Sequence, residues 1–419
     1  MYAGLVLVWW FVHTDKPFND LFFYKTNELP KEKTDQEKKP MKLFGLLFFL
    51  MGFFYPSIQS HAISDGKTHK DIKQLEQRIK KLEYERKRNS QSNNISTATG
   101  LSRSFNPAIS LHGLLLGTYN SEGNDNSSQS NKTGLSVEEL ELQLAGNVDT
   151  WFRVQSTFSM EGTSQFGLEE LVGSGLITNN LSLQVGKLFV PMGKHNQLHT
   201  HSQPFVATPV SNEMVLGEDG LKEIGFGASY LLPFSFFSEI NLQILEGENE
   251  DLFASTVNDG FAYLTRSGNS FDLSDETTMD ASLAYAFGDN SLSGPYRTTE
   301  VFGVDIRFKH KPLGREGYRT TIWQSEFLTS TREQIKTGFY TYLQQQFAKH
   351  WWAQGRYSHS YQQSDRSDQN QYSLALSYFP SEFLETKLEY THLNQYAADE
   401  NQLFLRLNFT LGAHKGHSY

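Results

Sequence analysis

The chain contains no cysteine among its 419 residues. This absence excludes a disulfide framework, cysteine-ligated zinc and iron–sulfur sites, and thiol catalysis. The sequence also lacks HExxH, P-loop and Rossmann glycine patterns, and no His-x-Ser pair occurs that would place both groups of a hydrolase on one strand face. We therefore predict that the protein is not an enzyme.

Long apolar runs and an excess of basic residues are also missing from the body of the chain. After Ala62 no apolar run reaches the roughly 18 residues of a transmembrane helix, so no such helix is predicted there. The 319 residues from Leu101 contain 21 basic and 36 acidic side chains, a net charge of −15. Because such a body repels nucleic acid, we predict no nucleic-acid partner.

The N-terminal part has the order of an export signal. Met41-Lys42 is followed by an apolar run and then by small residues ending at Ala62, which predicts cleavage after that residue. We interpret the residues before Met41 as the product of an upstream start codon; the alternative is a real membrane anchor. The predicted organisation is an extension over 1–40, a signal peptide over 41–62, a periplasmic coiled coil with a linker over 63–104, and a main domain over 105–419.

A short apolar seam follows the signal peptide. Ile72, Leu75, Ile79 and Leu82 are spaced by three, four and three residues, with charges at most other positions. This spacing predicts a coiled-coil helix of about two heptads, too short to be stable alone. It either pairs with itself in a homo-oligomer or forms a solvated helical leader.

After the linker the hydrophobic period changes to two. In the segment 401–411, apolar side chains alternate with polar ones, and aromatic pairs such as Trp151-Phe152 and Trp351-Trp352 flank similar segments. Alternation alone also fits a soluble sandwich, but aromatic girdles, export and alternating short and long connections favour a transmembrane barrel. We predict an all-β, antiparallel transmembrane barrel of about 16 strands, preceded by the short coiled-coil helix. The predicted strands are 108–119, 135–147, 151–159, 168–176, 181–188, 220–231, 234–245, 260–266, 278–287, 299–309, 318–328, 333–347, 351–360, 371–379, 385–392 and 401–411. The stretch 267–277 is predicted to be irregular.

Three segments carry a family resemblance. Phe105–Leu111, Tyr378–Phe383 and Asn401–His414 resemble a family of Gram-negative outer-membrane barrels similar to phosphate-selective porins of the O/P type. Some members of this family are described as zinc-regulated outer-membrane receptors. The resemblance implies an outer-membrane location, with membrane lipid and lipopolysaccharide as partners. By analogy with porins, it also implies that an oligomer formed through Ile72, Leu75, Ile79 and Leu82 is a homotrimer. It implies no substrate, since no dense arginine ladder is present.

The polar face of the strands predicts the lining of a lumen. A barrel of sixteen strands is wide enough to hold water, so charges that alternate with Leu and Phe are expected to face inward. Acids and bases on opposite walls would select small solutes by their size and by their charge in the electric field of the lumen. Alternatively, these charges pair along the wall and select nothing. The predicted pore-lining residues are Glu139, Glu141, Arg153, Glu239, Asp305, Arg307, Lys309, Arg356, Lys387, Glu389 and Arg406.

One predicted loop carries three histidines. His195, His199 and His201 have the spacing H-x₃-H-x-H, and two or three neutral imidazoles could hold one Zn²⁺ with water, Glu213 or Asp219. No single regular structure aligns all three rings, and a polar loop with chance histidines is the alternative. No other cofactor is predicted.

The same loop has a second expected role. In general porins the long loop after the fifth strand folds inward, so the resemblance implies that this loop narrows the pore. The predicted function is a porin-like channel for passive diffusion of small hydrophilic solutes or ions. The alternatives are a zinc-linked outer-membrane uptake receptor and a structural or adhesin barrel without an open pore.

Overall fold

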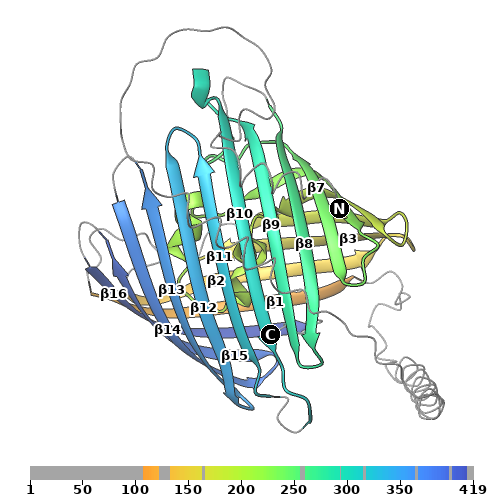
Figure 1. The fold of residues 1–419 in the computed structure, drawn as a ribbon. Helices are drawn as coiled ribbons and strands as arrows, with labels where there is room; N and C mark the ends of the chain where they lie inside the picture. The colour runs from red at the N-terminus through yellow and green to blue at the C-terminus, as the bar shows by residue number, and fades with distance from the viewer. Residues whose placement is uncertain are drawn as a thin grey trace, which may run out of the picture. The chain divides into compact units, whose positions relative to one another are not determined.

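The protein is described by a computed structural model (Figure 1). It covers residues 107–121, 133–162, 166–254, 260–292, 294–314, 318–363, 367–395 and 399–412. The predicted extension, signal peptide and coiled-coil seam lie outside these described residues.

The described residues form sixteen β-strands. Each strand pairs antiparallel with its neighbours in sequence, and the prediction of a sixteen-stranded antiparallel barrel is confirmed. The strands are β1 (Ala108–Asn120), β2 (Gly134–Asn147), β3 (Phe152–Glu161), β4 (Gly167–Leu176), β5 (Leu181–Phe189), β6 (Lys222–Leu231), β7 (Phe237–Leu245), β8 (Ala262–Ser274), β9 (Thr277–Asp289), β10 (Thr298–His310), β11 (Thr321–Thr331), β12 (Ile335–Ala348), β13 (Trp351–Gln362), β14 (Ser367–Ser381), β15 (Leu384–Asn394) and β16 (Asp399–Gly412).

The first and last strands close the barrel. β1 pairs with β16 from Ser110 opposite Gly412 to Asn120 opposite Gln402, so the ring has no unpaired strand edge. Closure satisfies the backbone donors and acceptors of every strand, which a sheet in contact with lipid requires.

The two faces of each strand differ as the alternation predicts. On β16 the outward-facing Leu403, Leu405 and Leu411 are 42%, 54% and 59% exposed, whereas the inward-facing Phe404 and Arg406 are 3% and 0% exposed. Most of the large apolar side chains exposed on the described strands occupy outward positions of this kind. The outer face is therefore apolar. Within the described ranges, no helix is both long and apolar enough to cross a membrane.

Strand β8 differs from its prediction. The segment expected to be irregular continues β8 to Ser274, and only Asp275 and Glu276 separate it from β9. The outward positions Thr265, Ser267 and Asn269 are polar, which removes the apolar alternation that marks the other strands. Pairing with β7 and β9 maintains the strand where the side-chain pattern does not predict one.

The connections are less regular than predicted. Short and long connections were expected in strict order, but β11 and β12 are joined by residues 332–334 only, and β13 ends at Gln362 before β14 begins at Ser367. These strands extend beyond their predicted ends, so the loops between them are short. The longest described connection joins β5 to β6.

The β5–β6 connection, which we call the inward loop (residues 190–221), lies within the ring of strands (Figure 1). It contains three short helices: η3 (His195–Gln197), η4 (Thr200–Ser202) and α4 (Val210–Leu216). A further turn, η5 (Gly294–Tyr296), precedes β10. Helix α4 packs against β11, β12, β13 and β14, and η4 packs against β1. The inward loop is therefore held by walls on several sides of the barrel.

Part of the barrel interior is apolar. The inward loop and the β7–β8 connection bury side chains against inward positions of β7 to β11, where the alternation pattern predicts mainly polar residues. Burial beneath loops favours these apolar inward residues, because they lose contact with water on folding. The cluster consists of Val190, Met192, Val215, Leu216, Leu221, Leu245, Leu252, Phe253, Ala262, Leu264, Ala284, Ala286, Val301 and Leu328.

Candidate functional site: the inward loop and the barrel wall

The strand register places all eleven predicted lining residues on the inward face of the barrel. They divide into two groups by exposure. Glu139, Glu141, Asp305, Arg356, Lys387, Glu389 and Arg406 are buried, whereas Arg153, Glu239, Arg307 and Lys309 retain access to solvent. The inward loop lies against several of the buried residues, so their charges contact the loop rather than the remaining lumen.

Glu326 on β11 is the main anchor of the inward loop. Its carboxylate accepts hydrogen bonds from the backbone N–H groups of Lys194 and His195, at 2.6 and 3.1 Å, and from Asn212 Nδ2 at 2.7 Å. Tyr340 on β12 donates a fourth, at 3.2 Å. One side chain that is 2% exposed therefore holds both the start of η3 and helix α4.

Glycines on the loop and on the wall permit this close approach. Gly193 has φ of 78°, and a Cβ added there would lie 2.5 Å from the Glu326 carboxyl carbon. Gly338, at an inward position of β12, faces Ser211 of α4, whose carbonyl oxygen would lie 2.4 Å from an added Cβ. Side chains at either position would push the loop away from the wall.

Charged residues of β15 and β16 hold the middle of the loop. Lys387 Nζ and Arg406 Nη2 donate to the carbonyl oxygen of Gln203, at 3.0 and 3.2 Å. Glu389 accepts hydrogen bonds from the backbone N–H groups of Val206 and Ala207. These buried charges thus satisfy backbone groups of the loop, which has no regular structure there to satisfy them.

Arg356 on β13 contacts the loop through its guanidinium face. The group lies 4.6 Å from the ring centroid of Phe205, a cation–π contact. It also donates to Gln371 Oε1 at 3.0 Å, and Gln371 Nε2 in turn donates to the carbonyl oxygen of Thr208. Arg356 is therefore occupied with the loop and with β14.

A group of partly accessible charges lies on β9 and β10, together with Lys194 of the loop. Arg307 donates to Asp280 at 2.7 Å, and Lys194 of the loop lies 3.8 Å from the same carboxylate. The side chains of Arg307, Lys194 and Asp280 are 29%, 24% and 18% exposed. Two bases and one acid thus border the interior space left by the loop, beside Lys309.

The structure separates the three predicted zinc ligands. His195 lies at Glu326, with its ring centroid 6.2 Å from that of Tyr340, whereas His199 and His201 lie near β1, β2 and β4. His199 and His201 stay together, with ring centroids 5.7 Å apart, so the prediction that two or three of these rings share one ion stays a prediction for this pair. The loop turns between η3 and η4 and directs their side chains to different walls.

Acidic residues of the wall surround the other two histidines. His201 Nδ1 lies 3.1 Å from Glu141 Oε2, and His199 Nδ1 lies 3.5 Å from the same oxygen and 3.4 Å from Glu169 Oε2. Glu170 lies 3.8 Å from His199 Nε2. The acids expected to complete the site, Glu213 and Asp219, do not belong to the candidate ligand groups within the described residues.

The histidines of the loop have opposite electrostatic environments. Burial and the charge of Arg356 lower the pKa of His195 to about 3. For His199, burial alone would lower the pKa, but the hydrogen bond with Glu169 and the charges of Glu141, Glu169 and Glu170 outweigh it and raise the pKa to about 9. These carboxylates therefore favour the protonated form of the His199 ring, whereas neutral imidazoles were expected.

Two important residues were absent from the predicted set. His112 on β1 stacks on His201, with ring centroids 3.9 Å apart and an interplanar angle of 9°, and Glu326 anchors the loop. Both lie at inward positions of their strands, so the alternation rule could have found them. Nothing in the local sequence indicates that the loop would reach either one.

No known protein-family model matches the chain. An uncharacterized protein of Aquifex aeolicus (strain VF5) is 24% identical over 349 residues, covering 71% of this chain and 72% of that protein. Among solved structures, an anion-selective porin from Comamonas acidovorans has a TM-score of 0.52 at 13% identity, covering 73% of this chain and 100% of the porin.

Two further porin structures agree with this comparison. OprB of Pseudomonas putida has a TM-score of 0.51 at 9% identity, covering 73% of this chain and 94% of OprB. OmpF of Salmonella typhi has a TM-score of 0.51 at 9% identity, covering 72% of this chain and 97% of OmpF. The chain has the fold of an outer-membrane porin. The predicted resemblance is confirmed for the fold, and a closed barrel with an apolar outer face is the structure expected in the Gram-negative outer membrane.

Proposed function

We propose that the protein is a porin-like channel of the outer membrane through which small hydrophilic solutes or ions diffuse passively. The observation that supports this most is the combination of an apolar outer face with charged, solvent-accessible residues on the inner face of β9 and β10. Water-filled barrels with such charges discriminate between solutes by their size and by their charge. We propose no enzymatic activity.

The inward loop acts in this proposal as the constriction. It covers the wall from β11 to β16 and contacts β1, β2 and β4, so solutes would pass along the remaining wall beside Arg307 and Lys309. Outer-membrane lipid and lipopolysaccharide would contact the apolar outer face. A homotrimer joined through Ile72, Leu75, Ile79 and Leu82 is part of the same proposal, and these residues lie outside the described part of the chain.

A structural or adhesin barrel is the second candidate. The observation that favours it is the amount of interior surface that the inward loop and the β7–β8 connection cover. The zinc-linked uptake receptor remains a third candidate, since two histidines of the loop do meet carboxylates of the wall.

Liposome swelling distinguishes a channel from a closed barrel. Purified protein reconstituted into liposomes should admit small neutral sugars rapidly and larger ones progressively more slowly, because the constriction sorts solutes by size. Heat-denatured protein is the control. Absence of swelling for the smallest sugar, with correctly folded protein in the vesicles, would favour the structural barrel.

A further inference from the structure

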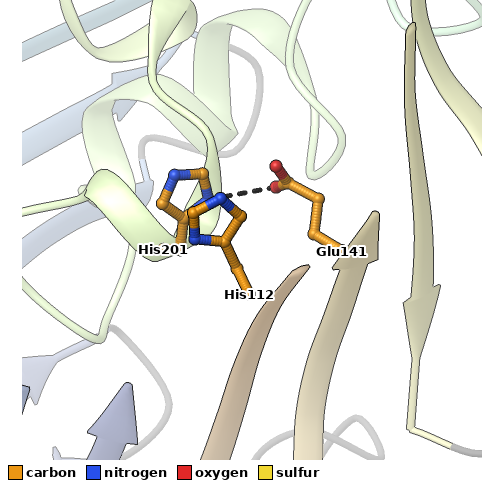
Figure 2. Close-up of side chains that lie close together, drawn as sticks. All are labelled: His112, Glu141 and His201. Carbon is orange, nitrogen blue, oxygen red and sulfur yellow. Dashed lines mark hydrogen bonds and ion pairs between the residues drawn. The ribbon is translucent and has the colours of Figure 1, made fainter. Parts of the chain in front are cut away.

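Three ligand-type side chains meet where the inward loop touches β1 and β2. His112 comes from β1, Glu141 from β2 and His201 from η4, and all three are buried (Figure 2). One nitrogen or oxygen atom of each lies within 4.8 Å of the corresponding atoms of the others. Figure 2 shows the two imidazole rings face to face, with the carboxylate of Glu141 reaching toward them.

The spacing of these groups suits a small metal ion. Ligands of a tetrahedral zinc ion lie about 2 Å from the metal and therefore roughly 3.3 Å from one another. His201 Nδ1 and Glu141 Oε2 are already 3.1 Å apart. The rings of His112 and His201 are stacked face to face, so they must rotate about their side-chain bonds before an in-plane nitrogen of each can face one ion.

A contact behind the site orients one of the rings. His112 Nδ1 lies 3.0 Å from Thr410 Oγ1 on β16, and this contact holds the ring in place. Metal-binding histidines commonly use their second nitrogen in this way, because the contact fixes the ring.

The charge balance around the site is a second, independent observation. Glu139, Glu141, Glu169 and Glu170 all point inward here, and Lys222 pairs with Glu169 at 2.9 Å. Glu139 is 4% exposed, and its Oε2 accepts no hydrogen bond within the described residues. The four carboxylates outnumber their basic neighbours, Lys222 and His199, so a bound divalent ion would stabilise this region.

We propose that His112, Glu141 and His201 bind one divalent metal ion of the zinc class, which links the inward loop to the barrel wall. Two imidazoles and one carboxylate form a donor set that suits Zn²⁺ and does not suit Mg²⁺ or Ca²⁺, which prefer oxygen ligands alone. Water or a neighbouring carboxylate such as that of Glu169 completes the coordination.

The residues beside the site are more accessible than its ligands. His199, next to the site, has a side chain that is 16% exposed, and that of Glu170 is 15% exposed, whereas His201 and Glu141 are nearly inaccessible. The site goes beyond the proposed channel and does not depend on it, since a closed barrel with the same loop would bind the ion equally well.

Isothermal titration of the purified, detergent-solubilised protein with zinc chloride, after dialysis against a chelator, tests the proposal. We expect one ion per chain, and we expect His201→Ala and His112→Gln each to weaken binding at least tenfold. His195→Ala is the matched control, because it removes an imidazole of the same loop that lies at Glu326, and it should leave zinc binding unchanged. The gel shift between boiled and unboiled samples establishes that each variant has folded.

Three results would overturn the proposal: no saturable zinc binding by the folded wild type, equal zinc binding by His201→Ala and the wild type, or equal affinity for magnesium and zinc, which would indicate only an acidic patch. If the folded wild type binds zinc but causes no liposome swelling, the proposed channel function is contradicted and the zinc site is not. A second expected result is slower tryptic cleavage after Lys194 when zinc is present, because the ion would tie the loop to β1 and β2.

Discussion

Replacing Glu326 by alanine should release the inward loop while leaving the barrel closed. The carboxylate accepts three hydrogen bonds from the loop and one from Tyr340. Removing it leaves two backbone N–H groups and the side-chain amide of Asn212 without their hydrogen-bond acceptor in a buried site. The barrel strands keep their own ladder bonds, so the change acts on the loop.

The expected magnitude follows from these contacts. Leaving a buried donor without its acceptor costs roughly 1 to 3 kcal/mol. Water can enter a site next to the lumen, so we take the lower end for the three loop donors, about 3 kcal/mol in total. A loss of about 3 kcal/mol shifts the equilibrium between attached and detached loop roughly a hundredfold toward detachment, since about 1.4 kcal/mol corresponds to a factor of ten.

Two assays detect the detached loop. Trypsin should cleave after Lys194 faster in Glu326→Ala than in the wild type, and single-channel current should become larger or noisier. Gln324→Ala is the matched control: Gln324 is a buried inward residue of the same strand, but it bonds Tyr340 and Tyr342 of the wall and makes no hydrogen bond to the loop. Equal cleavage rates and currents for the two variants would refute the role of Glu326 as an anchor.

Three further predictions concern the loop backbone, the lipid face and pH. Gly193→Ala should loosen the loop more than Gly314→Ala. Both glycines have φ of 78°, but of the two only Gly193 has a neighbour within 4 Å of an added Cβ. Equal rates of tryptic cleavage after Lys194 in the two variants would contradict this prediction. Leu405→Arg, near the middle of β16, should lower the free energy of unfolding in lipid vesicles by about 2 to 4 kcal/mol, whereas Leu411→Arg, near the strand end, should lower it by only about 0 to 1 kcal/mol. Similar urea midpoints for the two variants would contradict a lipid-facing position of Leu405. As pH falls from about 6.5 toward 3, the loop should loosen more in the wild type than in His195→Gln, because the detached His195 binds a proton that the buried ring resists, whereas the other titratable groups are the same in both proteins. Hydrogen exchange of the loop is compared at each pH, and the same pH dependence in both proteins would contradict this prediction.

The sequence predicts the barrel well because one physical pattern repeats along it. A strand between lipid and lumen must alternate apolar and polar side chains, and fifteen of the sixteen strands keep enough of that alternation to be placed closely. Strand β8 departs from its prediction because Thr265, Ser267 and Asn269 face outward. The second half of β8 is maintained by backbone hydrogen bonds to β7 and β9, and the side-chain pattern of β8 itself does not predict this pairing.

The site was less predictable because it joins segments far apart in the chain. The spacing of His195, His199 and His201 suggests one ligand set, but the loop path sends His195 to Glu326 and the other two to β1, β2 and β4. His112 pairs with a ring 89 positions later in the chain, and only the folded loop brings them together. The inward charges were assigned to the correct face, whereas their contacts with the loop could not be derived from alternation.

Single-channel recording in planar lipid bilayers tests the central claim most directly. Purified, folded wild-type protein should insert and produce discrete, ohmic current steps in simple salt, because water and ions would pass between the inward loop and the wall that carries Arg307 and Lys309. Insertion without any conductance steps, in protein whose gel shift demonstrates a closed barrel, would contradict a channel function.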